Sequence, residues 1–241
     1  MMLENPWKYL PQGADYVLPI DAPFVAAHND NHLHSAGEES ESKAQDRRDH
    51  LLQFHIPPVP FLGMFNAPVV LLLANPGYAD SDVAYFDRVH DLAIESAQSD
   101  AGTPIYPILS ENEDEDYKGW WRLRTRELAQ EVGGFDELAE RLLVVELHGY
   151  HSKKWSAPLR NFPSQEFGFN LVRQAMDRDA IIIAARCQHH WFASVPGLRN
   201  YEYLIPALSS PRSAHLSRTN LKPENFERVV TKLKSGNSTG L

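Results

Sequence analysis

The chain has 241 residues, of which 43% are apolar, which suits one sizeable core in a single domain. Its net charge of −9 argues against a protein that coats nucleic acid without selection, although a local basic patch is compatible with it. The single cysteine, Cys187, excludes an internal disulfide and a cluster held by four thiolates. No apolar run reaches the length of a membrane span. We therefore expect a cytoplasmic protein that does not enter a membrane.

The first part of the chain gives no strong core pattern. We predict that residues 1–56 form an irregular N-terminal extension packed on the domain, with one short helix near Ala44–Phe54. His28, Asp30, His32 and His34 are possible metal ligands, but no predicted helix or strand fixes their geometry, so we predict no metal site. The chain also lacks a P-loop and a Rossmann glycine fingerprint, and we expect no cofactor.

Apolar runs alternate with helical patterns over residues 57–234, the predicted domain, and residues 235–241 read as a disordered tail. Continuous apolar runs predict buried strands, and Pro206 marks a weaker fourth strand as an edge. The predicted strands are Val69–Ala74, Leu142–Leu147, Ala180–Ala185 and Tyr201–Leu208. The predicted helices are Ser81–Ala97, Trp120–Val132, Phe135–Arg141, Phe167–Asp177, Cys187–Ser194 and Pro223–Leu233. This order predicts an α/β fold, a three-layer α/β/α arrangement with a central four-stranded, mostly parallel sheet.

Ligands of such sheets bind at the carboxyl ends of the strands, which directs attention to the segments that follow them. Asn75-Pro76-Gly77-Tyr78 follows the first predicted strand. The Asn75 side chain can hold a water or a hydroxyl group, while Pro76 and Gly77 fix a tight turn. Taken alone, the same residues are better explained as an ordinary strand-exit turn.

Glu146 and His148 follow the second strand. They would lie about 6–7 Å apart on one face if the strand continued through them. A carboxylate beside an imidazole suits acid–base work or recognition of a base. The alternative is that Glu146 pairs with Lys153 or Arg186 at the rim of the sheet.

The segment after the fourth strand, Leu208–His215, is rich in small hydroxyl residues. Exposed backbone N–H groups of such a loop can grip phosphate, and Arg212 adds a fork-shaped donor. Taken alone, a surface loop is the simpler interpretation.

In their order these segments resemble the uracil-DNA glycosylase superfamily, over about residues 57–228. Leu73–Gly77 is similar to the Gly-Ile-Asn-Pro-Gly motif of its mismatch-specific uracil/thymine branch. Leu208–His215 resembles the late motif of the superfamily, His or Asn followed by Pro-Ser-Pro-Leu-Ser and often by Ala-His. The resemblance implies a hydrolase that cleaves the N-glycosyl bond of a damaged or mismatched base in DNA, with DNA as its partner.

The resemblance also assigns roles to residues. Asn75 would position the attacking water, Glu146 falls where the superfamily often has a base-reading Asn, and Leu208 falls where many members have the residue that stabilises the leaving base. His148, His151 or His215 could supply that missing donor. The base-binding residues would be Pro76, Gly77, Tyr78 and Glu146, and the DNA-binding residues Ser209, Ser210, Pro211, Arg212 and Ser213.

Two other functions stay open at this point. One is a glycosylase-like module that binds nucleic acid or protein without cleaving. The other is a hydrolase or binder of a free nucleoside or nucleotide. A basic groove through Lys153, Arg212 and Arg218 would favour DNA, whereas a closed pocket would favour a small ligand.

Overall fold

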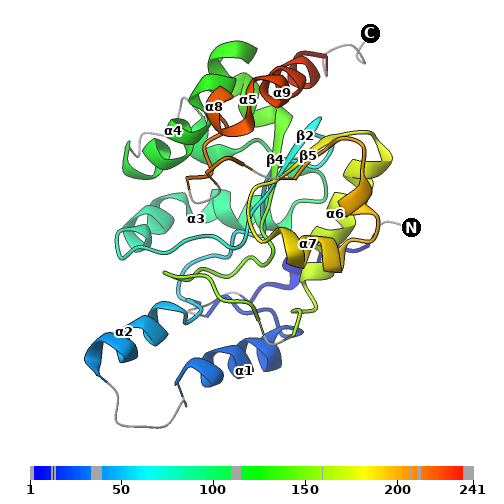
Figure 1. The fold of residues 1–241 in the computed structure, drawn as a ribbon. Coiled ribbons are helices and arrows are strands. Elements are labelled where there is room, and N and C mark those ends of the chain that lie inside the picture. Colours follow the sequence, from blue (N-terminus) through cyan, green and yellow to red (C-terminus); the bar gives the residue numbers. More distant parts are fainter. Residues whose placement is uncertain are drawn as a thin grey trace.

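The structure is a computed structural model, and it describes residues 3–11, 13, 15–33, 40–109, 115–158, 160–206, 208–210 and 213–235. It is an α/β fold built on a six-stranded mixed sheet with strand order β3-β1-β4-β2-β5-β6. Helices lie on both sides of the sheet (Figure 1). The predicted α/β class is confirmed, whereas the prediction of four strands is wrong.

Four strands run parallel, and they are the four that the apolar runs predicted. They are β2 (Val69–Leu72), β4 (Leu142–Val145), β5 (Ile181–Ala184) and β6 (Leu204–Ile205). β2 lies between β4 and β5, so its carboxyl end lies between the carboxyl ends of these two strands at one edge of the sheet. β6 is shorter than predicted.

The two additional strands are β1 (Phe61–Met64), antiparallel to β4, and β3 (Gly102–Thr103), antiparallel to β1. Both are short and each contains a glycine, which is why the sequence reads as connector there. The glycine in β1 is required by close packing, because a Cβ on Gly63 would lie 2.0 Å from the Leu142 carbonyl oxygen.

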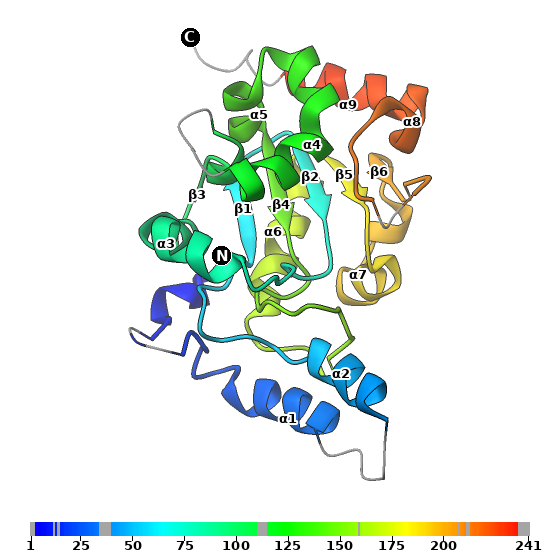
Figure 2. The ribbon, with the colours of Figure 1, turned by 90° about the vertical axis from the view of Figure 1, so that its left-hand side faces the viewer.

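The sheet separates two hydrophobic cores. Along β2, Val69 and Leu71 face one core and Val70 and Leu72 the other, which is the alternation of a strand buried on both faces. The first core is covered by α3 (Asp82–Gln98), α4 (Glu115–Val132), α5 (Phe135–Arg141), α8 (Arg218–Leu221) and α9 (Pro223–Ser235). The second is covered by α6 (Gln165–Asp177), α7 (Gln188–Ser194) and N-terminal residues (Figure 2).

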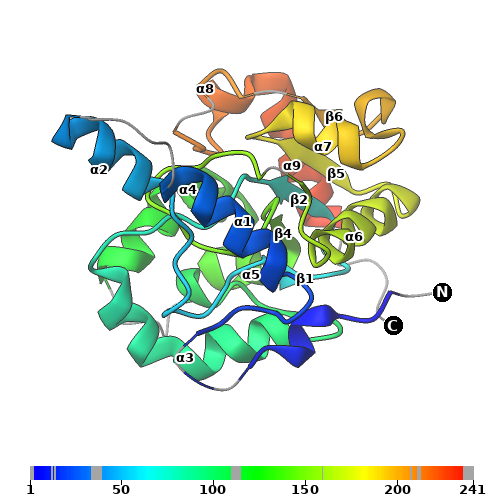
Figure 3. The ribbon, with the colours of Figure 1, turned by 90° about the horizontal axis from the view of Figure 1, so that it is seen from below.

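The N-terminal part is more ordered than predicted. It contains a 3-10 helix (Pro6–Tyr9), which packs against α3, and two helices, α1 (Ala22–Leu33) and α2 (Glu41–Asp49), which lie next to each other beneath the sheet (Figure 3). The expected helix near Ala44–Phe54 starts and ends earlier, as α2. α1 was missed because it buries little, Val25 and His28, and so has no clear apolar stripe. Trp7 and Leu18 belong to the second core, so this part is integral to the packing.

The remaining elements are two 3-10 turns, Tyr106–Ile108 and Leu198–Asn200. Ser164 takes the N-cap position of α6, but its side chain makes no capping hydrogen bond. The predicted tail lies outside the described residues from 236 onward. None of the described helices combines the length and the apolar character needed to cross a membrane.

Gly63→Ala should destabilise the fold by about 3 kcal/mol or more, because the backbone at Gly63 has φ = 109° and the new Cβ would collide with backbone of β4. Gly119→Ala is the control, since a Cβ there meets nothing within 4 Å and alanine is the better helix former. Urea unfolding measures both. Equal stability of the two variants would contradict the close approach of β1 and β4.

Candidate functional site

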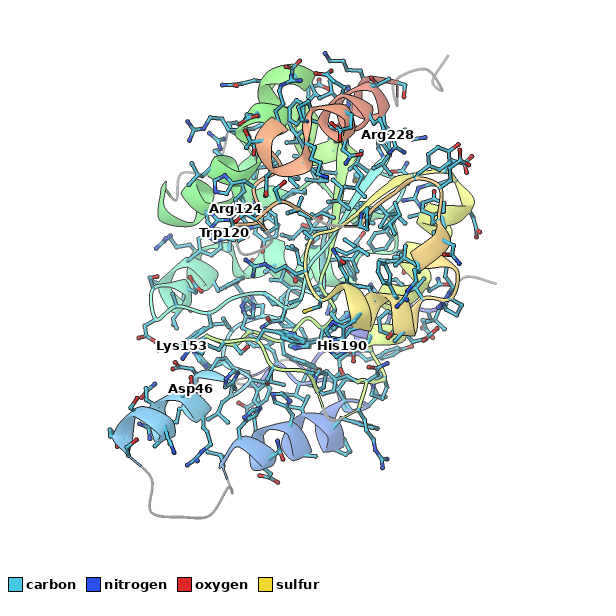
Figure 4. The ribbon with its side chains drawn as sticks, in the orientation of Figure 1. Asp46, Trp120, Arg124, Lys153, His190 and Arg228 are labelled. Carbon is cyan, nitrogen blue, oxygen red and sulfur yellow. The ribbon has the colours of Figure 1, made fainter. Side chains whose placement is uncertain are left out.

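A cavity of about 620 Å³ opens at the carboxyl ends of β2, β4 and β5. The Asn75–Tyr78 loop forms one wall, and Glu146 and Arg186 extend from the ends of β4 and β5. Five aromatic side chains line it: Tyr78, Tyr85, Trp120, Trp121 and Trp155. Trp120 on α4 and Lys153 lie on the same side of the molecule, one above the other (Figure 4). Aromatic walls with a few polar groups are typical of a site for a flat heterocyclic ligand.

The side-chain amide of Asn75 is held in one orientation. Its Nδ2 donates to Ser152 Oγ at 2.9 Å, to the Pro76 carbonyl at 3.0 Å and, more weakly, to the Tyr150 carbonyl at 3.5 Å. Ser152 Oγ donates its own proton to the Lys154 carbonyl, so every one of these partners needs a donor. The amide nitrogen must therefore face the protein. Oδ1 accepts no hydrogen bond from the described residues and is available at the cavity wall.

Residues 150–152 form a ledge that supports this loop. Ser152 pairs with Gly77 in a parallel bridge, and its N–H donates to the Pro76 carbonyl. His151 is buried below, with Nδ1 2.7 Å from the Gly77 carbonyl oxygen and Nε2 3.0 Å from that of Pro57. Burial lowers the pKa of His151 to about 4, and the hydrogen bonds to the two carbonyls oppose that shift. A neutral ring has one N–H and donates to one of these carbonyls at a time. His151 ties the loop to the scaffold and is not among the groups that line the cavity.

Glu146 lines the cavity although only 7% of its surface is exposed. Its Oε2 is shielded from solvent and has no hydrogen-bond partner in the described part of the chain. Burial raises the pKa of Glu146 to about 8, against the opposing influence of Arg186, so the neutral acid predominates at pH 7. The sequence alone predicts an ionised carboxylate at Glu146. Lys153, one of the two ion-pair partners considered for Glu146, instead pairs with Asp80 at 3.0 Å.

His148 does not share a face with Glu146. β4 ends at Val145, so the continuous strand needed for that geometry is absent. His148 packs against Phe162, with ring centroids 5.4 Å apart, and burial lowers its pKa to about 3. The cavity walls do not include it.

The loop after β6 turns inward. The Ser209 and Ser210 N–H groups donate to the backbone and side-chain oxygens of Asn220, and Ser213 Oγ donates to the Ser210 carbonyl. The Asn220 amide also holds the His215 carbonyl. These serines and His215 lie outside the cavity lining, and Pro211 and Arg212 lie outside the described residues. Leu208, Ala214 and Leu216 belong to the first core.

Two of the basic residues expected to form a DNA groove have acidic partners, and the third, Arg212, lies outside the described residues. Besides the Lys153–Asp80 pair, Arg218 is bound by Glu131 and Glu227, and its N–H donates to Glu127. The described residues that line the cavity also include Arg88, Arg186 and Asp82.

Several cavity residues were missed from the sequence. Tyr85, Trp155, Arg88 and Arg186 carry no local motif, and neither does the pair Trp120-Trp121. Position is the only feature of the sequence that points to these residues, because they follow strand ends or lie on helices next to those strand ends.

Of the possible metal ligands, His28 meets His32 edge to face with ring centroids 4.8 Å apart, and His32 stacks on His50 with centroids 5.1 Å apart. His34 lies outside the described residues. Within the described ranges no group of three or more His, Cys, Asp or Glu residues is placed to hold a metal ion. Cys187 is a free cysteine whose thiol pKa is raised by burial and by Glu146 to about 12.

Comparisons with protein-family models, with curated proteins and with solved structures find no match for this chain. The resemblance to the glycosylase superfamily therefore rests on the motifs and their order.

Glu146→Gln should stabilise the protein increasingly as the pH rises. The folded protein keeps Glu146 protonated up to about pH 8, whereas its ordinary pKa is 4.5, so wild-type stability falls between these values relative to the variant. The difference in unfolding free energy should grow by about 1.4 kcal/mol per pH unit at most in this interval. Urea unfolding from pH 5 to 8 measures it, with Glu202→Gln as an exposed-site control. A pH-independent difference would contradict the neutral carboxyl.

Proposed function

We propose that this protein hydrolyses the N-glycosyl bond of a nucleobase bound in the cavity. The observation that carries the proposal is the orientation of Asn75, whose amide nitrogen is consumed by Ser152 and backbone carbonyls while Oδ1 remains available. A carbonyl oxygen fixed in this way can accept a hydrogen bond from a water molecule and hold that water for attack. Such positioning lowers the barrier without any change in the protein during the reaction.

The aromatic walls support the identity of the ligand. Tyr78, Trp120 and Trp155 offer flat apolar surfaces, and a nucleobase is a flat ring with polar edges. The arginines Arg88 and Arg186 suit a ligand that carries phosphate next to the base. Both features fit a nucleotide unit, whether free or in a polynucleotide.

The first candidate substrate is a damaged or mismatched base in DNA. It follows from the motif resemblance, because Asn75-Pro76-Gly77 comes after a buried strand, as in the superfamily. The base would have to leave the helical stack to enter the cavity.

The second candidate substrate is a free nucleoside or nucleotide. It is favoured by the ion pairs of Lys153 and Arg218 and by the hydrogen bonds of the Ser209 and Ser210 N–H groups to Asn220, which occupy groups expected to grip a DNA backbone. A net charge of −9 also opposes DNA binding at a distance.

Asn75→Ala should reduce the single-turnover rate by about 100-fold or more, because the water loses its acceptor. The substrates to test are duplex and single-stranded oligonucleotides with one uracil, hypoxanthine, xanthine or mismatch, and the corresponding free nucleotides. Release of free base is measured by chromatography. Asn66→Ala, an exposed asparagine outside the cavity, is the matched control and should keep the wild-type rate.

If folded wild-type protein in excess releases no base from any of these substrates, the hydrolase proposal is contradicted. Binding of DNA without turnover, unchanged in Asn75→Ala, would indicate a non-cleaving module instead.

The two substrate candidates differ in their response to salt. If DNA is the substrate, affinity should fall steeply between 50 and 200 mM salt as phosphate contacts release counterions, roughly 10-fold or more for several contacts. A free nucleotide held by one phosphate should lose only a few-fold. Fluorescence anisotropy with labelled oligonucleotides and with a labelled nucleotide separates the two. A shallow slope for DNA would leave the free nucleotide as the substrate.

A further inference from the structure

The proposed reaction has an unmet requirement in this cavity. When an N-glycosyl bond breaks, its electron pair stays on the base, and a donor near the base stabilises that charge. Leu208 has no donor and lies in the core. His148, His151 and His215, the other groups considered for this task, are not part of the cavity wall.

Glu146 is placed to meet that requirement. It comes from the end of β4, next to the Asn75 loop that follows β2, and it lines the same cavity. The side chain is more than nine-tenths buried, and Oε2 has neither solvent nor a partner among the described residues. A carboxylate would leave an uncompensated charge on that oxygen, whereas a neutral carboxyl group leaves a weaker acceptor. The neutral group also carries an O–H donor.

We propose that Glu146 is the general acid of this site, a carboxyl group kept neutral by its surroundings that gives its proton to the departing base. The role rests on the proposed N-glycosyl hydrolase function. The bond from the sugar to the base nitrogen breaks, and its electron pair takes the Glu146 proton. Water held by Asn75 adds hydroxide to the sugar carbon. The remaining water proton passes to solvent, and solvent returns one to Glu146, so the sum is ligand plus water giving sugar and free base.

The charged and titratable groups around Glu146 determine the pH range in which its carboxyl group loses its proton. Burial raises the pKa of Glu146 to about 8 and that of Cys187 to about 12, while the hydrogen bond to Asp80 raises the pKa of Lys153. His148 stays neutral. The other charged or titratable groups of the cavity and its edge are Tyr78, Asp82, Tyr85, Arg88, Arg124 and Arg186. Arg186 is the one that opposes the raised pKa of Glu146.

The proposal makes the reaction depend on pH in a defined direction. Wild-type single-turnover rates should fall about tenfold per pH unit above pH 8, as Glu146 loses its proton. Glu146→Gln keeps an N–H donor but has no proton to transfer. It should therefore bind the substrate within about threefold of wild type, cleave at least about 100-fold more slowly and lose the pH dependence.

The experiment has one arm without substrate. Infrared difference spectra between pH 6.5 and 9.5 should show the C=O band of a neutral carboxyl group that disappears at high pH, in wild type and not in Glu146→Gln. The second arm measures single-turnover cleavage of the uracil, hypoxanthine and xanthine oligonucleotides and nucleotides by both proteins across the same range.

Each outcome decides the matter. A neutral carboxyl band together with a slow, pH-independent Glu146→Gln variant supports the proposal. An ionised Glu146 at pH 6.5, or a variant with the wild-type rate and pH profile, overturns it. A neutral band with no cleavage of any substrate by wild type refutes the hydrolase function and the acid role with it, while an ionised Glu146 in an active enzyme refutes the acid role alone.

Discussion

The candidate site depends on the contact between the loop after β2 and the ledge that follows β4. Gly77 pairs with Ser152, and the same serine accepts a hydrogen bond from Asn75. This contact joins the ends of two neighbouring parallel strands, so the geometry of the loop is set by the sheet register. His151 extends this contact between the loop and the ledge to Pro57, and thereby to the connector before β1. The orientation of the Asn75 amide follows from these bonds, because each partner is an acceptor that the amide nitrogen must satisfy.

The same sheet determines the state of Glu146. A strand covered on both faces excludes water along its length, and Glu146 is the first residue after β4. Its carboxyl group therefore lies where ionisation is costly, at the point where the cavity begins. An acid at this position lowers the stability of the fold above pH 4.5. Natural proteins keep such destabilising groups mainly at functional sites.

The sequence predicted the parts of this arrangement that depend on local pattern. Val69–Leu72, Leu142–Val145 and Ile181–Ala184 are uninterrupted apolar runs, and the polar residues after them marked the right edge of the sheet. The strands β1 and β3 escaped because each contains a glycine, Gly63 or Gly102, in close contact with neighbouring backbone, and β3 has only two residues. Local sequence pattern could not predict the protonation of Glu146 either, because the protonation depends on burial by helices that are distant in the sequence.

The late loop shows that composition alone gives an incomplete account of a segment. Serines and prolines suggested an exposed grip for phosphate, but Leu208, Ala214 and Leu216 are spaced so that they enter the core, and Asn220 consumes the serine N–H groups. Arg218 is tied to glutamates as well. Under the proposed function, recognition resides in the cavity, where Asn75 and Glu146 would meet the ligand from two adjacent strand ends. Selectivity would then depend on hydrogen-bond donors and acceptors, and the protonation state of Glu146 would decide whether its carboxyl group acts as a donor or as an acceptor.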